Sequence, residues 1–320
     1  MSLEKADALV VKSVDVTNSS LVLRLFTREF GKISGLAKGG RRLKNPFETS
    51  LDLLASIRLS FIRKSSNALD LLTEAKLVRR FRPTTRNLRG LYAGYCVAEA
   101  LDCATSDYEP IPRLWELADA TLDRFQFRGD VPARFTFFEA GMLEELGEFP
   151  STRYCVECGE ELPLDSIANL ERRLYFDVDG GGVVCSRCRA SKPFPGLVPT
   201  TVGAFKVLEA ALNGASETLR SSDALKKWEK ARETELSKIA PVYVQEERDK
   251  ARLAFEQLED EAIAAFDAFP SSARASCRDL IDRYVCRVLR RRPRSFDFLK
   301  FVFSSSNKDE KEATKEAQTF

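Results

Sequence analysis

The stretch LVVKSVDVTNSSLVLRLFTREFGKISGLAKGGRR, residues 9–42, carries the clearest structural signal in the chain. Its apolar residues alternate with polar ones, and a period of two is typical of strands that bury one face. VTNSS (16–20) and TREFGK (27–32) interrupt the alternation with turn-forming residues, including Gly31, which accepts a positive φ angle. The stretch therefore predicts three consecutive strands joined by short turns.

Further apolar runs extend this pattern to five short strands. They are predicted over residues 8–14, 21–26, 33–37, 51–61 and 69–73. Five short strands in so small a segment favour a small β-barrel. The segment LAKGGRRLKNPF (36–47) follows the third strand, and its two glycines, four basic residues and proline predict an exposed loop.

From residue 88 the apolar period lengthens to the three and four residues of a helix. LYAGYCVAEAL (91–101), LWELADATLDRF (114–125) and ARFTFFEAGMLEEL (133–146) all follow it, so we predict an α+β protein. The predicted domains are a basic barrel (1–80), a first helical part (81–150), a cysteine-containing lobe (151–192), a second helical part (193–303) with a charged helical extension (215–270), and a disordered tail (304–320).

Composition excludes several function classes. The 320 residues include no histidine, which removes Ser-His-Asp and Cys-His mechanisms and HExxH zinc sites. No GxxxxGK[ST] or GxGxxG motif is present, so the sequence does not favour an ATPase or a dinucleotide-binding enzyme. We expect a cytoplasmic protein, because the N-terminal residues do not resemble a signal peptide and no apolar run has the length of a membrane span.

The charges are distributed unevenly, although 50 basic residues nearly balance 48 acidic ones. Residues 1–90 contain 18 Lys or Arg and 8 Asp or Glu, and Glu29 is the only acidic residue between positions 24 and 44. Such a basic domain predicts a polyanionic partner. The candidate DNA contacts are Lys38, Arg41, Arg42 and Lys44 in the loop, with Arg24, Arg28 and Lys32 in or near the preceding hairpin.

Four phenylalanines lie among these basic residues, at positions 26, 30, 47 and 61. Aromatic side chains beside a basic groove are typical of single-strand binding, because nucleic-acid bases stack on them. Alternating strand positions favour the other interpretation, that most of these rings belong to the barrel core.

Four of the eight cysteines form two CxxC pairs, Cys155/Cys158 and Cys185/Cys188, separated by 26 residues. Four thiolates at this spacing predict a structural Zn²⁺ site, with an unbound reduced set as the alternative. Cys155-Val156-Glu157 with the second CxxC also resembles the zinc deaminase pattern, but Val184 replaces its proline and Cys158 would occupy the position of the catalytic water. Cys96, Cys103, Cys277 and Cys286 are predicted core residues, and DVDGGG (177–182) a hairpin turn rather than a calcium loop.

The order of these features resembles the RecO family of bacterial recombination mediators. The resemblance is carried by residues 9–42, LYAGYCVAEAL, FEAGMLEELGEFPSTRYCVECG (138–159), FDVDGGGVVCSRC (176–188) and, after a gap, YVCRVLRRRPRSFDFLKF (284–301). It implies an N-terminal OB-fold, a helical domain with a zinc lobe, and no catalytic turnover. Residues 215–270 and the tail after 304 depart from the family pattern.

The resemblance also implies the function and the partners. Proteins similar to this family bind single- and double-stranded DNA, anneal complementary strands, bind RecR and the C-terminal tail of single-stranded DNA-binding protein, and help to load RecA, in the cytoplasm at the nucleoid. It carries over to Lys38, Arg41 and Arg42 as DNA contacts, with Arg24, Arg28 and Lys32 as neighbours, and to the four knuckle cysteines as zinc ligands. We therefore hypothesise a non-enzymatic DNA-binding mediator. The alternative is a scaffold whose basic barrel docks an acidic protein partner.

Overall fold

The structure is a computed structural model that describes residues 2–40, 47, 51–64, 69–83, 87–127, 130–191, 196–232 and 241–304. These residues form two compact units, one from residues up to 132 together with residues from 291, and the other from residues 133–290. The strands are β1 (Leu3–Asp15), β2 (Leu21–Thr27), β3 (Gly31–Ala37), β4 (Ser56–Ile62), β5 (Asp70–Arg79), β6 (Arg173–Asp177), β7 (Gly182–Val184) and β8 (Leu197–Thr201). The helices are α1 (Leu88–Ala104), α2 (Pro112–Phe127), α3 (Val131–Glu145), α4 (Ser186–Ser191), α5 (Val202–Arg232), α7 (Pro241–Asp267), α8 (Ser271–Val288) and α9 (Leu299–Val302). Two short 3-10 turns are η1 (Leu164–Ser166) and η2 (Arg294–Phe298).

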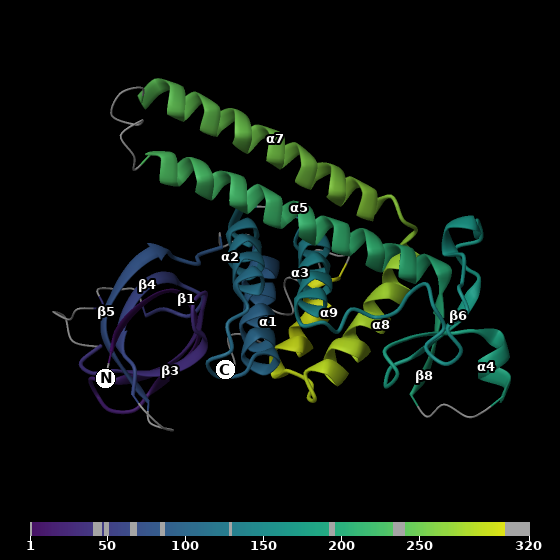
Figure 1. Cartoon of the computed structure of the whole chain (residues 1–320), viewed down its shortest axis with the longest axis horizontal. Coiled ribbons are helices and arrows are strands. Elements are labelled where there is room, and N and C mark those ends of the chain that lie inside the picture. The colour runs from purple at the N-terminus through teal and green to yellow at the C-terminus, as the bar shows by residue number, and fades with distance from the viewer. Residues whose placement is uncertain are drawn as a thin grey trace. The chain divides into compact units, whose positions relative to one another are not determined.

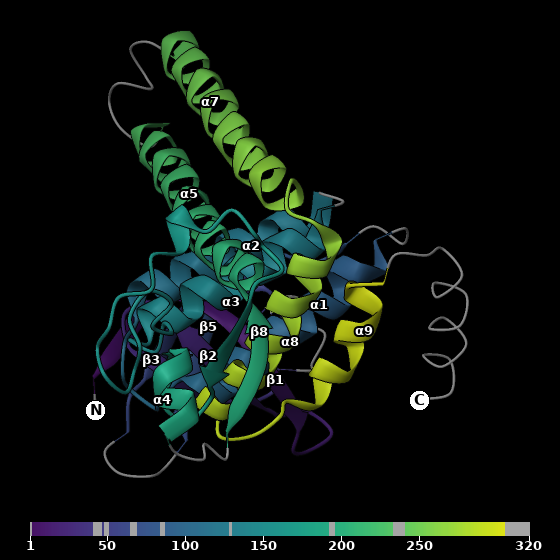
Figure 2. The ribbon, with the colours of Figure 1, turned by 90° about the vertical axis from the view of Figure 1, so that its right-hand side faces the viewer.

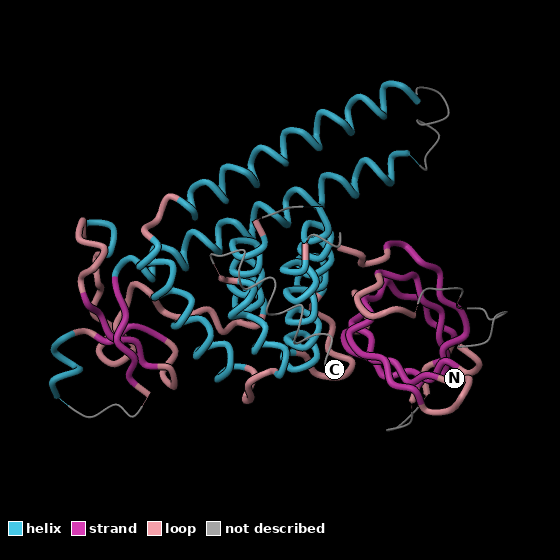
Figure 3. The backbone as a smooth tube through the Cα atoms, turned by 180° about the vertical axis from the view of Figure 1, so that it is seen from behind, coloured by secondary structure: helices cyan, strands magenta, loops and turns pink. Residues whose placement is uncertain are grey.

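The first unit begins with a closed barrel (Figure 1). Its strands follow the order β1-β2-β3-β5-β4, with antiparallel pairing except between β3 and β5, which run parallel. The ring that the five strands form is visible along its axis in Figure 3. This is the topology of an OB-like fold, in which each of the five strands pairs with a neighbour on both sides, β3 with β5 only at Gly35/Asp70 and Leu36/Leu71.

Alternating side chains of these strands fill the barrel. Val10, Leu23, Ile33 and Leu59 are fully buried in this core, one from each of four strands. The core interpretation holds for most of the phenylalanines, because Phe47 and Phe61 are buried in the barrel core and Phe30 packs against it, edge to face with Phe61. Phe26 is also fully buried but does not belong to the barrel core.

The five strands predicted from the sequence are confirmed, although all five have different bounds and β1 begins at Leu3 rather than at residue 8. Residues 51–55 form a turn rather than the start of β4. In this turn Leu54 adopts a φ of 62° and donates its backbone N–H to the carbonyl of Val10. β5 runs on to Arg79, beyond the predicted end at residue 73. The prediction ended too early because Glu74 and Lys76 interrupt the apolar run in the sequence. Both residues belong to the strand, and their side chains are exposed on the outer face of the barrel.

The helices α1 and α2 complete the first unit together with the chain from residue 291 onward. Residues 294 and 295 donate their backbone N–H groups to the carboxylate of Glu99 on α1, at 3.0 and 2.7 Å. Tyr92 on α1 stacks on Phe298 with ring centroids 4.6 Å apart, and meets Phe301 edge to face. These contacts fix residues 294–304 against α1.

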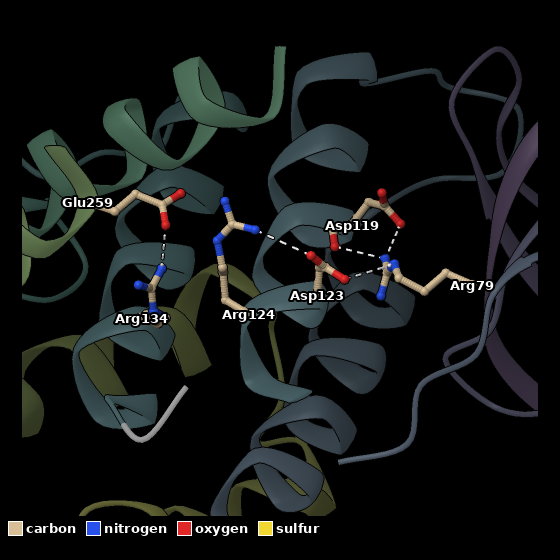
Figure 4. Close-up of polar contacts among 6 residues, drawn as sticks. All are labelled: Arg79, Asp119, Asp123, Arg124, Arg134 and Glu259. Carbon is tan, nitrogen blue, oxygen red and sulfur yellow. Dashed lines mark hydrogen bonds and ion pairs between the residues drawn. The ribbon is translucent and has the colours of Figure 1, made fainter. Parts of the chain in front are cut away.

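The second unit combines helices with the small lobe that contains the CxxC pairs. The long helices α5 and α7 lie side by side as an antiparallel pair (Figure 2). Arg134 on α3 pairs with Glu259 on α7 at 3.1 Å (Figure 4), and both side chains are at most 2% exposed. Glu139 on α3 pairs with Arg278 on α8 and is fully buried, which raises the pKa of its carboxyl. Charged side chains therefore join α3 to both neighbouring helices.

The lobe has a three-stranded antiparallel sheet in the order β7-β6-β8. The hairpin prediction for residues 177–182 is confirmed, because Asp177 and Gly182 are paired across β6 and β7 and Gly181 has a φ of +71° in the turn.

Within the described residues, no helix is both long and apolar enough to cross a membrane.

Candidate nucleic-acid interface and metal centre

The four knuckle cysteines converge in the lobe. The sulfur atoms of Cys155, Cys158, Cys185 and Cys188 all lie within 4.8 Å of one another. Four thiolates around a tetrahedral Zn²⁺ at about 2.3 Å would have sulfur atoms about 3.8 Å apart. The Cys158–Cys185 separation of 3.7 Å already has this value, so the cluster fits a metal of this coordination with little movement.

Two local structures bring the cysteines together. In the first knuckle, Gly159 has a φ of +70° and donates its backbone N–H to the carbonyl of Cys155, which closes a tight turn. In the second, β7 ends at Val184, and α4 begins directly after Cys185. The two knuckles are joined by a hydrogen bond of 3.0 Å from the backbone N–H of Val156 to the carbonyl of Val183. The backbone N–H of Cys185 also donates to the sulfur of Cys155.

The surroundings of the cluster favour a thiolate at Cys158. The pKa of Cys158 is lowered to about 6, mainly because the backbone N–H of Glu160 donates to its sulfur, with help from the thiol of Cys188. The pKa of Cys188 rises to about 12, first because its thiol donates to Cys158. A divalent metal displaces such protons, because thiolates rather than thiols are its ligands.

This geometry contradicts the deaminase alternative. A deaminase zinc keeps one coordination position for the attacking water, whereas four sulfurs complete a tetrahedral shell. Glu157, which would shuttle the proton in that reaction, is exposed on the first knuckle. The cluster is therefore suited to a structural metal. A metal bound there would stabilise the lobe, because the described buried apolar residues beside the cysteines are few.

Three of the candidate DNA contacts hold the barrel against the helices of its own unit. Arg24 pairs with Asp102 on α1 at 2.8 Å, and Arg28 pairs with Glu116 on α2 at 2.6 Å. Lys32 is 7% exposed, and its ammonium group donates to the carbonyl oxygens of Asp102 and Thr105 at 2.7 and 2.5 Å.

The environments of these groups change their pKa values. Burial lowers the pKa of Lys32, because desolvation penalises its charged form. The hydrogen bond to Glu116 raises the pKa of Arg28.

Lys38 lies in the turn that follows β3 and is exposed to solvent. No carboxylate among the described residues lies within ion-pair distance of its ammonium group. The other three loop candidates, Arg41, Arg42 and Lys44, lie outside the described residues. Lys38 is therefore the described member of the predicted set whose charge is available to a ligand.

A cluster at the end of the barrel had no signal in the sequence. Tyr108 has a φ of 62°, donates its hydroxyl to the buried carboxylate of Asp70, and donates its backbone N–H to the carbonyl of Lys32. The guanidinium of Arg63 lies over the Tyr108 ring, 4.1 Å from its centroid. Burial and the bond to Asp70 raise the pKa of the Tyr108 hydroxyl. The three residues are 38 and 45 positions apart in sequence, so no local pattern could have joined them.

The remaining cysteines divide into two kinds. Cys96 and Cys277 are buried, as predicted for core residues, and Cys286 is half-buried. Cys103 is half-buried, and its sulfur accepts hydrogen bonds from the guanidinium of Arg291 at 2.8 and 3.0 Å. It is thus a polar contact of α1 rather than part of an apolar core.

Comparison with known proteins gives two matching family models. Residues 1–81 match the model for the N-terminal part of recombination protein O, and residues 86–237 match the model for its C-terminal part. The chain is 42% identical over 185 residues to the DNA repair protein RecO of Rhodopirellula baltica, covering 58% of this chain and 67% of that protein. It is 33% identical over 189 residues to the RecO of Geobacter metallireducens, covering 59% and 73%. The RecO of Syntrophus aciditrophicus is 29% identical over 206 residues, covering 64% and 76%.

Proposed function

The chain belongs to the RecO family of DNA repair proteins, and from this premise we propose that it is a recombination mediator that binds DNA through its barrel. The family is named for recombination and DNA repair and is not a family of enzymes. The proposed ligands are single- and double-stranded DNA, bound without base specificity through their phosphates. Binding of this kind releases counterions from the DNA, and it weakens steeply as salt is added.

The single observation that supports this proposal most is the exposed ammonium group of Lys38, which has no carboxylate partner within the part of the chain that the structure describes. It lies at the beginning of the loop that contains Arg41, Arg42 and Lys44, and we propose that these four residues contact the phosphates. Arg24, Arg28 and Lys32 were candidates as well. Because their charged groups bind carboxylates or carbonyls of α1, α2 and the turn after α1, we assign them to positioning the barrel rather than to direct contact.

The experiment is a salt titration of DNA affinity. Fluorescence anisotropy of a labelled single strand is measured at several salt concentrations with the wild-type chain and with a Lys38→Ala, Arg41→Ala, Arg42→Ala triple variant. Removing three phosphate contacts is expected to lower the slope of log affinity against log salt by about 2 for single strands. Lys76→Ala is the matched control, because Lys76 is exposed on β5 near Glu74 and lies outside the loop. An unchanged slope in the triple variant would exclude the loop from the contact surface.

We propose Zn²⁺ as the metal of the cysteine cluster, with a structural role. The four sulfurs would hold it, and it would supply a cross-link between the two knuckles. Metal analysis of the purified protein tests the identity, and substitution by Co²⁺ would give the visible absorption of tetrahedral thiolate coordination. A protein purified under reducing conditions that holds no metal and takes up no Co²⁺ would contradict the proposal.

The further steps follow the family. We propose that two complementary strands anneal on the chain because neutralised phosphates lose their mutual repulsion. We also propose RecR and the C-terminal tail of single-stranded DNA-binding protein as partners, RecA loading as the outcome, and the bacterial cytoplasm as the location. Annealing of two oligonucleotides, followed by a quenched fluorophore, tests the first step, and the triple variant should lose it together with DNA affinity.

A further inference from the structure

The four sulfurs of the cysteine cluster differ in their exposure to solvent. Cys155 and Cys185 are buried, with 2% and 7% of their surface exposed, and Cys188 is half-buried. Cys158 is the exposed member of the four. Oxidants in solution react with accessible thiolates, whereas buried thiols are largely inert. Cys158 is therefore the sulfur of the cluster that a dissolved oxidant reaches first.

The charged groups around Cys158 indicate which kind of oxidant can approach it. The guanidinium of Arg187 lies 3.7 Å from its sulfur and pairs with the carboxylate of Glu160 at 2.9 Å, so these two charges offset each other. Glu157 adds an exposed carboxylate next to Cys158 in the chain. This negative charge repels an anionic oxidant but not hydrogen peroxide, which is neutral. The surface therefore favours a neutral hydroperoxide.

A second sulfur lies within reach of Cys158. The sulfur of Cys185 is 3.7 Å away, on the other knuckle. A disulfide has a sulfur–sulfur length of about 2.0 Å, so the two atoms must approach each other by about 1.7 Å. Cys158 lies in a turn, and Cys185 lies between the end of β7 and the start of α4. Neither residue is inside a helix or a strand, so a movement of this size does not break the hydrogen bonds of such an element.

We propose that Cys158 is an oxidation site for hydrogen peroxide and that Cys185 converts the oxidised form into a disulfide between the two knuckles. The Cys158 thiolate attacks one peroxide oxygen and the O–O bond breaks, which gives a sulfenic acid and a hydroxide that takes up a proton. The Cys185 thiolate then attacks the sulfenic sulfur, the S–S bond forms, and the S–O bond breaks with loss of a second hydroxide, which also takes up a proton. Two thiolates, one peroxide and two protons thus become one disulfide and two molecules of water.

The disulfide would remove two ligands from the metal, and this consequence rests on the Zn²⁺ that we propose for the cluster. The sulfurs of Cys155 and Cys188 alone cannot complete a tetrahedral site, so the metal is released. Val184 is the buried aliphatic residue described beside the cysteines, so little apolar packing compensates for the lost metal. Peroxide should therefore loosen the lobe, and a thiol reductant should restore both thiolates.

The test follows oxidation of the full-length, metal-loaded protein by equimolar hydrogen peroxide. Short exposures include dimedone, which traps sulfenic acids, and longer exposures omit it. Cleavage after Glu157, Arg172 and Arg187 places the four cysteines in separate peptides for mass spectrometry. Dimedone should label Cys158 at least about tenfold more than Cys155, because the Cys155 thiol is buried.

Longer exposure should give a disulfide between Cys158 and Cys185. Release of the metal, followed with a chromogenic chelator, should keep pace with formation of this disulfide, and a thiol reductant should remove it. Cys103→Ser is the matched control, because Cys103 is also incompletely buried and its sulfur is bonded by Arg291 outside the cluster. This variant should release metal at the wild-type rate.

Two results would overturn the proposal. One is dimedone label that appears on Cys188 or Cys103 before Cys158, and the other is metal release by peroxide without a disulfide at Cys158. The mapping does not depend on the metal. A protein that holds no metal but still forms the Cys158–Cys185 disulfide would support the oxidation site and contradict the Zn²⁺ proposal, so the two proposals fail separately.

Discussion

Replacing Glu259 by Gln removes one charge from the buried pair that joins α3 and α7. In the wild-type chain the guanidinium of Arg134 lies 3.1 Å from the Glu259 carboxylate, and neither side chain exceeds 2% exposure. The substitution keeps the size and an acceptor oxygen but removes the negative charge that faces the buried Arg134 guanidinium. Breaking a buried pair from one side costs about 3–5 kcal/mol, and the retained acceptor places this variant near the lower end.

Hydrogen exchange measured by mass spectrometry reports this loss of stability in α3 and α7 separately from the rest of the chain. Peptides from α3 and α7 should exchange on the order of 10²-fold faster in Glu259→Gln, since 1.4 kcal/mol corresponds to a factor of ten. The control is Arg283→Gln, which removes an exposed i,i+4 pair with Asp279 and should cost less than about 1 kcal/mol.

A double variant isolates the pair from the packing around it. Arg134→Met with Glu259→Met should be more stable than either single Met variant, because no charge remains buried. If Glu259→Gln exchanged like the wild type, or if the double variant lost the sum of the two single costs, the argument from an uncompensated buried charge would be refuted.

Three further predictions concern the barrel and the lobe. Lys32→Met should remove a pH dependence of stability. Because burial lowers the pKa of Lys32, the unfolded chain binds this proton more tightly than the folded chain does, so wild-type stability against urea rises as the pH increases toward the ordinary lysine pKa of 10.5. The variant should lack that rise. Tyr108→Phe should cost about 1–3 kcal/mol in urea unfolding, because the carboxylate of Asp70 keeps the backbone N–H of Lys64 but loses the Tyr108 hydroxyl as a donor, and an unchanged midpoint would show that another donor replaces the hydroxyl. Cys185→Ser should abolish metal retention and speed hydrogen exchange in residues 151–191 while DNA affinity of the barrel is preserved, and exchange that is unchanged throughout the lobe would contradict a structural metal.

Local sequence patterns predicted the structure correctly wherever the environment of a side chain is determined by residues close to it in the sequence. The strand alternation in residues 9–37 predicted strands that bury one face, and Leu23, Leu25 and Ile33 lie on that buried face, because a period of two places alternate residues on one side. The two CxxC pairs predicted a converging cluster for a similar reason, since each pair already brings two sulfurs together in one turn.

Contacts between distant segments could not be predicted in this way. Arg28 and Glu116 are 88 positions apart, and Glu139 and Arg278 are 139 apart, with no period or motif that links them.

The charge of the barrel shows why such contacts matter for function. The excess of basic residues in residues 1–90 suggested a broad polyanion-binding surface, yet the acidic partners of several of them lie beyond position 90. Asp102 neutralises Arg24, Glu116 neutralises Arg28, and Arg79 is held by Asp119 and Asp123 on α2 (Figure 4).

These pairs restrict the charge that is free to meet a phosphate. A partnered guanidinium must give up its carboxylate before it binds DNA, which offsets much of the energy of the new contact. The exposed ammonium of Lys38 has no carboxylate partner among residues 2–40 and the other described ranges, so on binding it would give up only water and counterions. The salt dependence of DNA binding should therefore be smaller than the total charge of the barrel suggests, because the charges of Arg24, Arg28 and Arg79 are already paired. Net charge counted along a sequence overestimates an electrostatic binding surface whenever the fold supplies the opposite charges from another segment.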